Sequence, residues 1–248
     1  MDSTPVNLQS GDPIQVTLSY SGTTLSATLL DLESNCALPE SLAAMRAALG
    51  SHRCIAASDF RSTDLGSVVI VPAAGSATPE IFSAVAELLR QGTNVLWELG
   101  AAFLDSADFA QQQTLAKEYF GISIGRPVDI WPQANSRKRK AGTPVQNARG
   151  MRAIGHEQIP YVAYHWPVQA HVRDFSRVIP VSAASGPAIA HWNDVPVGWS
   201  KNIAAGTVVF LGSPLGPALR AGDSEATTLF QTIVARNSLL PRPSFSQK

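Results

Sequence analysis

Two continuous apolar runs with a helical segment between them form the clearest pattern along the chain. Val68–Val71 and Val95–Trp97 contain no polar side chains, whereas residues 79–90 place apolar side chains at helical spacing. Strands that are buried on both faces of a parallel sheet read as continuous apolar runs. Residues 66–104 therefore predict a strand–helix–strand unit with parallel strands and a right-handed crossover.

The segments on both sides of this unit extend the α/β pattern. Residues 160–201 change to short strands separated by turn residues, which indicates antiparallel pairing. We therefore expect a flavodoxin-like, doubly wound parallel sheet over residues 25–240, with a small antiparallel β extension from residues 160–201. The remaining elements that the pattern predicts are strands at 14–20, 23–32, 54–57 and 207–211, and helices at 39–49, 107–120 and 224–239, the last capped by Asp223.

Three segments fall outside this regular pattern. Residues 1–24 are expected to form an N-terminal extension or hairpin, residues 121–160 an exposed insertion, and residues 241–248 a tail. The hairpin conflicts with the sheet, because an antiparallel partner at 14–20 cannot lie beside the strand at 24–32 without displacing a parallel neighbour. One of these two assignments must therefore fail.

Composition narrows the function classes. The 248 residues carry no formal net charge, 15% of them are charged and 45% are hydrophobic. This balance disfavours overall disorder, a fibrous protein and nucleic-acid binding through bulk charge. The basic run Arg137–Lys140 is expected to be a solvated part of the insertion, with nucleic-acid contact or a localisation signal as the alternatives.

Cysteine usage and the N-terminal residues bear on the compartment. Cys36 and Cys54 are too few for a disulfide framework and are expected to be reduced, although a single bridge stays open. The N-terminal residues lack the basic and apolar regions of a signal peptide. The longest apolar run, Val68–Ala74, is far shorter than the about 20 residues that span a bilayer. We therefore expect a cytoplasmic protein without a membrane partner.

Loops of small residues follow three of the predicted parallel strands. In an open α/β sheet, ligands bind beyond the carboxyl ends of the strands, and small residues let backbone N–H groups approach a ligand. The loops predict a pocket for a small polar molecule, and tight strand-to-helix turns are the alternative explanation. The candidate ligand-binding residues in them are Ala74, Gly75, Leu99, Gly100, Gly212 and Ser213.

Glu98 and two histidines are the candidate chemical groups. Glu98 is a carboxylate at the end of an otherwise apolar strand, a setting that suits general acid–base catalysis. The alternative is a structural carboxylate that accepts backbone N–H bonds at a helix N-terminus. His165 is the second candidate catalytic residue and His191 a further ligand-binding candidate, because each lies near a strand end beside a tryptophan. No histidine pair has helical metal-ligand spacing, so neither a metal nor a cofactor is expected.

Four segments carry a resemblance to a known group of proteins. They are the strand end Ile70–Gly75, the helix end Leu89–Gly92, the strand and turn Val95–Gly100, and the closing strand and loop Val208–Pro214. Together they resemble the class I glutamine amidotransferase-like superfamily, which includes trehalose-utilisation (ThuA-like) and intracellular-protease/deglycase-like branches. The resemblance extends over about residues 25–240 and is firmest at 66–104 and 205–238.

The resemblance breaks at the residue that carries the chemistry of that superfamily. True amidotransferases have Cys-x-Gly where this chain has Glu98-Leu99-Gly100, and their His-Pro-Glu element is matched here by His165-Trp166-Pro167 without the glutamate. A carboxylate cannot replace a thiolate in forming a glutamyl thioester, so glutaminase activity is not expected. If the chain is an enzyme, the resemblance implies a hydrolase or lyase type of reaction that uses Glu98.

Three functional hypotheses follow. The first is an atypical amidotransferase-like domain, alone or as a homo-oligomer, that binds a small polar molecule near Glu98. The second is a non-enzymatic subunit or interaction module. The third is a carbohydrate-binding protein, because residues 10–25 resemble a hairpin of legume-type lectin domains. The first two differ in whether Glu98 opens into a polar pocket with a histidine within reach or is held by backbone amides alone.

Overall fold

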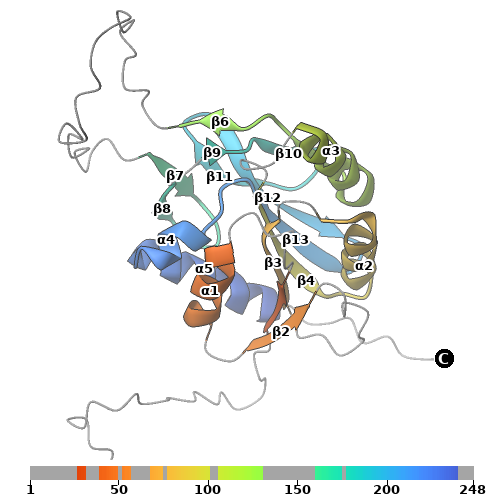
Figure 1. Cartoon of the computed structure of the whole chain (residues 1–248), viewed down its shortest axis with the longest axis horizontal. Coiled ribbons are helices and arrows are strands. Elements are labelled where there is room, and N and C mark those ends of the chain that lie inside the picture. Colours follow the sequence, from red (N-terminus) through yellow and green to blue (C-terminus); the bar gives the residue numbers. More distant parts are fainter. Residues whose placement is uncertain are drawn as a thin grey trace, which may run out of the picture.

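One mixed nine-stranded sheet organises the molecule (Figure 1). The computed structural model describes residues 27–31, 39–49, 52–56, 68–74, 77–100, 106–130, 160–174 and 177–239. In sheet order the strands are β2 (His52–Ala56), β1 (Ala27–Asp31), β3 (Val68–Ala74), β4 (Asn94–Leu99), β13 (Gly206–Leu211), β12 (Val195–Ile203), β11 (Ala188–Trp192), β7 (Tyr161–Tyr164) and β8 (Ala170–Arg173).

The sheet has a parallel part and an antiparallel part. Pairing is parallel from β2 through β1, β3 and β4 to β13, and antiparallel from β13 through β12, β11 and β7 to β8. The expected flavodoxin-like sheet with a small antiparallel extension is therefore wrong. Four of the nine strands are antiparallel additions to the same sheet, and the sheet curls into a half-barrel.

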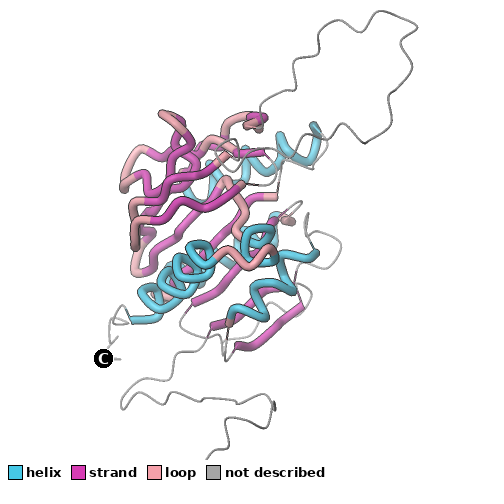
Figure 2. Tube along the Cα trace, turned by 90° about the vertical axis from the view of Figure 1, so that its left-hand side faces the viewer, coloured by secondary structure: helices cyan, strands magenta, loops and turns pink. Residues whose placement is uncertain are grey.

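Helices cover both faces of the sheet. On one face lie α2 (Pro79–Arg90) and α3 (Ser106–Phe120), and on the other lie α1 (Pro39–Ala48), α4 (Gly216–Arg220) and α5 (Ser224–Leu239), at the right and left of Figure 1 respectively. Two small two-stranded sheets complete the described part, β5 (Ile122–Ile124) with β10 (Val181–Ala183) and β6 (Val128–Asp129) with β9 (Arg177–Val178). Figure 2 shows the strands continuing from the antiparallel part at the top to β2 at the bottom.

The alternation of side chains along the central strands divides the core into two clusters. Successive side chains of a strand point to opposite faces of the sheet. Trp97 therefore packs beneath α2, with its ring 4.6 Å from that of Phe82 and stacked on Phe210 at 6.0 Å. Leu96, one residue earlier on β4, belongs to the cluster beneath α1, α4 and α5. The same alternation places Glu98 on the α4 side.

A hydrogen bond between distant strands shows how strongly the sheet curls. Ser213 follows β13 and its hydroxyl donates to Asp174, which follows β8. Those two strands are four places apart in the sheet, and neighbouring strands lie about 4.8 Å apart, so a flat sheet would separate them by about 19 Å. Curling of the antiparallel part over the α4–α5 face brings the two residues into contact.

Several sequence-based assignments change with the structure. Residues 121–160 were expected to be an exposed insertion, but β5 and β6 lie within them and Ile122, Ile124 and Ile130 are buried. Within 160–201 the pattern predicts short strands at 161–165, 177–181, 188–192 and 195–201, and none of them corresponds to β8. Asp223 does cap α5, because its Oδ1 accepts the N–H groups of Glu225 and Ala226 at 3.0 and 3.1 Å.

The neighbours of β1 show which positions beside it in the sheet are occupied. Both edges of β1 are occupied by parallel partners, β2 on one side and β3 on the other. No antiparallel partner can therefore lie beside β1 in the sheet. Residues 14–20, and also Arg137–Lys140 and Cys36, lie outside the described residues.

In the described residues no helix is both long and apolar enough to cross a bilayer.

The close approach of α4 to α1 yields a testable prediction. A Cβ added at Gly216 would lie 1.9 Å from Ser41 Oγ and 2.5 Å from Ser41 Cα, so the backbone must move to admit it. We expect Gly216→Ala to lower the free energy of unfolding by about 1–3 kcal/mol. Urea denaturation measures the change. Lys117→Ala, on the exposed side of α3, is the control and should stay within about 0.5 kcal/mol of wild type; equal stability of both variants would contradict the packing described.

Candidate functional site

Glu98 lies at the end of β4 and is closed inside the protein. Its side chain has 0% exposure, and its Oε1 accepts the backbone N–H of Leu215 at 2.9 Å. Leu215 is the N-cap residue of α4, whose first N–H groups have no partner within the helix. Glu98 thus supplies an acceptor to a helix N-terminus, which is the structural alternative that the sequence left open.

Three other polar side chains share the interior with Glu98. Tyr164 ends β7 and is 2% exposed, Asp174 follows β8 at 2%, and Ser213 follows β13 at 3%. Ser213 donates to Asp174, and Tyr164 is close enough to both Glu98 and Asp174 to feel their charges. We call Glu98, Tyr164, Asp174 and Ser213 the buried polar cluster.

The burial of Tyr164 and its charged neighbours change the pKa of its hydroxyl. Burial raises the pKa of the Tyr164 hydroxyl far above its ordinary value, and the negative charges of Glu98 and Asp174 raise it further. The nearby Ser213 side chain opposes the shift by a smaller amount. Desolvation is the leading cause, in agreement with the 2% exposure of Tyr164. The four side chains of the cluster therefore belong to the interior of the protein.

The two candidate histidines lie beside each other. The ring centroids of His165 and His191 are 5.4 Å apart, with His165 exposed and His191 half-buried. His165 is the residue after Tyr164, and it is exposed whereas Glu98 is buried. Their catalytic and ligand-binding roles remain predictions.

In two of the small-residue loops, a glycine N–H group forms a hydrogen bond within the protein. The Gly100 N–H donates to the carbonyl of Ala74 at 2.8 Å, and the Gly212 N–H donates to that of Val197 at 2.7 Å. Leu99 is fully buried, and a Cβ on Gly212 would lie 1.9 Å from the carbonyl oxygen of Ile179. The Gly100 and Gly212 amides are thus engaged in tight turns and strand contacts. Gly75 lies outside the described residues.

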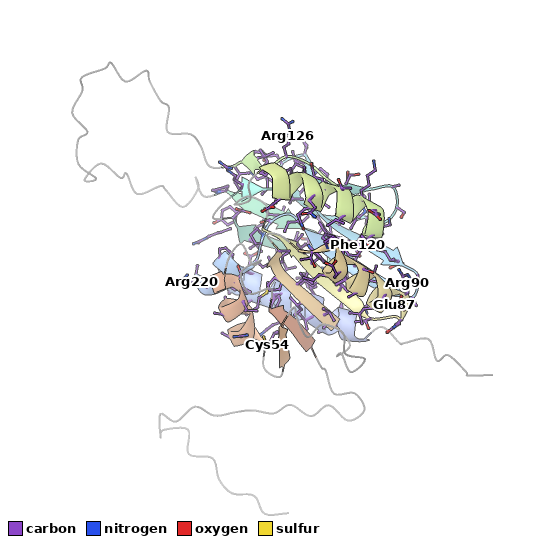
Figure 3. All side chains as sticks on the ribbon, turned by 45° about the vertical axis from the view of Figure 1, so that its right-hand side comes forward. Cys54, Glu87, Arg90, Phe120, Arg126 and Arg220 are labelled. Carbon is purple, nitrogen blue, oxygen red and sulfur yellow. The ribbon has the colours of Figure 1, made fainter. Side chains whose placement is uncertain are left out.

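Three surface hollows lie between described residues at some distance from β4 in the sequence. One runs along α3, one lies between α1 and α4, and one lies between β8 and the start of α5; Glu98 lines none of these three. The exposed free thiol of Cys54 lies near the lower edge of the ribbon in Figure 3. It belongs to β2, which is separated from β4 and Glu98 by two strands. Within the described ranges, no three His, Cys, Asp or Glu side chains gather as a metal-binding group.

Sequence reasoning missed Tyr164 and Asp174. Tyr164 had a usable signal, because it is the last residue of an alternating strand, whereas Asp174 follows a strand that the pattern did not reveal.

The burial of the polar cluster limits the reactions that its side chains can catalyse. Glycoside hydrolysis, for example, needs two carboxylates that face the scissile bond from both sides. Glu98 and Asp174 are 0% and 2% exposed and cannot touch such a substrate in this conformation.

Comparisons with known proteins identify the fold without a family. No protein-family model matches the chain, and no curated protein matches its sequence. Among solved structures, the chain is similar to the exo-β-1,4-mannosidase Op5Man5 from an Opitutaceae bacterium (TM-score 0.55, 11% identity, 87% of this chain and 36% of that one). It is also similar to a catalytic mutant of a GH42 β-galactosidase from G. stearothermophilus (TM-score 0.54, 12% identity, 88% of this chain and 31% of that one).

A third similar structure is covered by the alignment over almost its whole length. It is the cytoplasmic protein STM1381 from Salmonella typhimurium, with TM-score 0.53 and 9% identity over 85% of this chain and 98% of that one. The chain spans about a third of the length of the two glycosidases, and at these identities the likeness shows the fold alone. The matches lend no support to the expected amidotransferase-like or ThuA-like resemblance, and those descriptions are set aside together with the flavodoxin-like one.

The burial of Tyr164 predicts how stability depends on alkaline pH. The pKa of Tyr164 is raised in the folded state, so above about pH 10 the unfolded chain loses this proton while the folded chain keeps it. Stability from this group is therefore complete below about pH 10 and falls above it. Between about pH 9 and about pH 11, wild type should lose about 1.4 kcal/mol more than Tyr164→Phe.

Urea denaturation of the two proteins at both pH values measures this difference. Tyr161→Phe is the matched control, since Tyr161 lies on the same strand and is half-buried. It should keep the wild-type loss. Parallel alkaline losses in wild type and Tyr164→Phe would show that the Tyr164 hydroxyl reaches water.

Proposed function

We propose that this domain is a non-catalytic module that retains an α/β fold and acts by binding other molecules at its surface. The observation that carries the proposal is the closure of Glu98, whose side chain is 0% exposed and accepts the Leu215 N–H. A general acid or base must come within hydrogen-bond reach of the substrate atom whose proton it moves. A carboxylate that is sealed beneath α4 and bound to its N-terminus does not meet this condition.

The physical role of Glu98 in such a module is to join β4 to α4. Removing the acceptor leaves the Leu215 N–H buried without its partner, which is costly, whereas an amide in place of the carboxylate keeps a carbonyl oxygen at that point. The carboxylate also lies near Asp174, because both charges act on Tyr164. Neutralising one of two neighbouring buried charges removes part of their desolvation cost.

The two substitutions of Glu98 should differ in their effect on stability. Glu98→Gln should change the free energy of unfolding by about 1 kcal/mol or less, and Glu98→Ala should lower it by about 2–4 kcal/mol. A metabolite thermal-shift screen on wild type and Glu98→Gln tests the function: any ligand should stabilise both proteins equally. Glu118→Gln, exposed on α3, is the matched control. A metabolite that stabilises wild type and Glu118→Gln but not Glu98→Gln would show that Glu98 belongs to a ligand site.

Carbohydrate binding is the second candidate function. One observation favours it, the fold that the chain shares with parts of an exo-β-1,4-mannosidase and a β-galactosidase. Those two proteins are named for their action on β-mannosides and β-galactosides. This chain spans about a third of their length, so their activity is not transferred to it. A module of this kind would bind β-linked mannosides or galactosides without cleaving them.

Calorimetric titration of the full chain with β-1,4-mannooligosaccharides and β-galactosides tests this candidate. We expect binding of one class with no released sugar, and the same affinity in Glu98→Gln, because the carboxylate is out of reach. Release of monosaccharide that Glu98→Gln abolishes would contradict the proposed module. The absence of binding to both classes at millimolar sugar would remove the carbohydrate candidate.

A further inference from the structure

His165 and His191 form a cross-strand pair on the antiparallel part of the sheet. Ala163 of β7 lies opposite His191 of β11, and the His165 N–H continues the ladder by donating to the carbonyl of Ile189 at 2.9 Å. His165 is therefore the diagonal neighbour of His191 on the same face of two antiparallel strands. Long side chains in such diagonal positions are within reach of each other. The distance of 5.4 Å between the ring centroids shows that these two meet.

Solvent reaches the His165 ring of the pair, whereas a ring nitrogen of His191 is buried without a hydrogen-bond partner. His165 is exposed, so an ion or small molecule can reach the two rings from solvent. His191 is half-buried, and its Nδ1 is buried with no hydrogen-bond partner among the described residues. A buried ring nitrogen without a partner is unfavourable and calls for an explanation. An ion coordinated between the two rings would give this nitrogen one.

The separation of the rings fits coordination of one ion. Imidazole nitrogens bind zinc at about 2.05 Å with tetrahedral angles, and this places the centroids of two such rings about 5.2 Å apart. The observed separation is 5.4 Å, and the planes are tilted by 49° instead of stacked. Both values therefore agree with two ligands that converge on a shared ion.

We propose that His165 and His191 chelate a divalent transition-metal ion of the kind that imidazole prefers, such as Cu²⁺, Ni²⁺ or Zn²⁺. The two rings supply two ligands, and water completes the coordination from the exposed side. The site is separate from the buried polar cluster and does not depend on the proposed surface module. It is also distinct from groups of three or more ligating side chains, of which the described residues hold none.

Ni²⁺ titration by calorimetry tests the pair directly. The full chain is used without an affinity tag, and Cys36→Ser and Cys54→Ser are present throughout, because the exposed Cys54 thiol is a competing ligand. We expect one Ni²⁺ per chain. His165→Asn should weaken binding about 100-fold, because one ring lacks the effective concentration that the second ring provides in a chelate. Since His165 is exposed, this variant should fold normally.

The matched control is His171→Asn, an exposed histidine on the edge strand β8, which should bind like the parent. A double-mutant cycle separates chelation from two independent weak sites. In a chelate, His165→Asn with His191→Asn loses little more affinity than either single variant; two independent sites would instead show additive losses of bound ions, one per substitution. Lowering the pH should weaken binding, because protons compete with the ion for the rings. No binding by the parent, unchanged binding in His165→Asn, or additive losses would each overturn the proposal.

Discussion

The hydrogen bond from Ser213 to Asp174 closes the curl on which the interior depends. It joins the ends of two strands that a flat sheet would hold about 19 Å apart. Curling carries the antiparallel strands over the α4–α5 face and brings Tyr164 near Glu98. Each buried carboxylate then needs a donor, because a buried charge without hydrogen bonds is strongly destabilising. Ser213 donates to Asp174, and the Leu215 N–H donates to Glu98. One oxygen of each buried acid thus has a donor in the structure.

Local pattern was enough to predict the parallel part of the fold and not enough to predict its closure. The apolar runs in β3 and β4 identify those strands because both are buried on both faces. The pattern did not predict strand β8, because Ala170–Arg173 is a short edge strand with two charged or titratable side chains. The curl was out of reach of sequence reasoning, since the contact between Ser213 and Asp174 joins positions 39 residues apart through side chains that have no local signature.

The candidate site illustrates the same limit at the level of one residue. The sequence places Glu98 at a strand end, and the structure confirms that position. Whether a carboxylate there faces a pocket or the interior depends on which face it shares with its neighbours. Alternation along β4 puts it with Leu96 on the α4 side, where Leu215 meets it. The chain thus shares its fold with parts of two glycosidases, while Glu98 and Asp174, the two acids of its buried polar cluster, are closed to solvent, and the proposed module accounts for both observations.

Carboxyl footprinting of the native chain tests the closure of Glu98 most directly. A carbodiimide and a small amine modify carboxylates that water can reach, and peptide mass spectrometry measures the rate at each position. The account predicts rapid modification of Glu87 and Glu118, which are exposed, and no modification of Glu98 or Asp174 until the chain is unfolded in urea. Modification of Glu98 in the native chain at a rate close to that of Glu87 would contradict the account, because it would show an open pocket where the structure has a sealed interior.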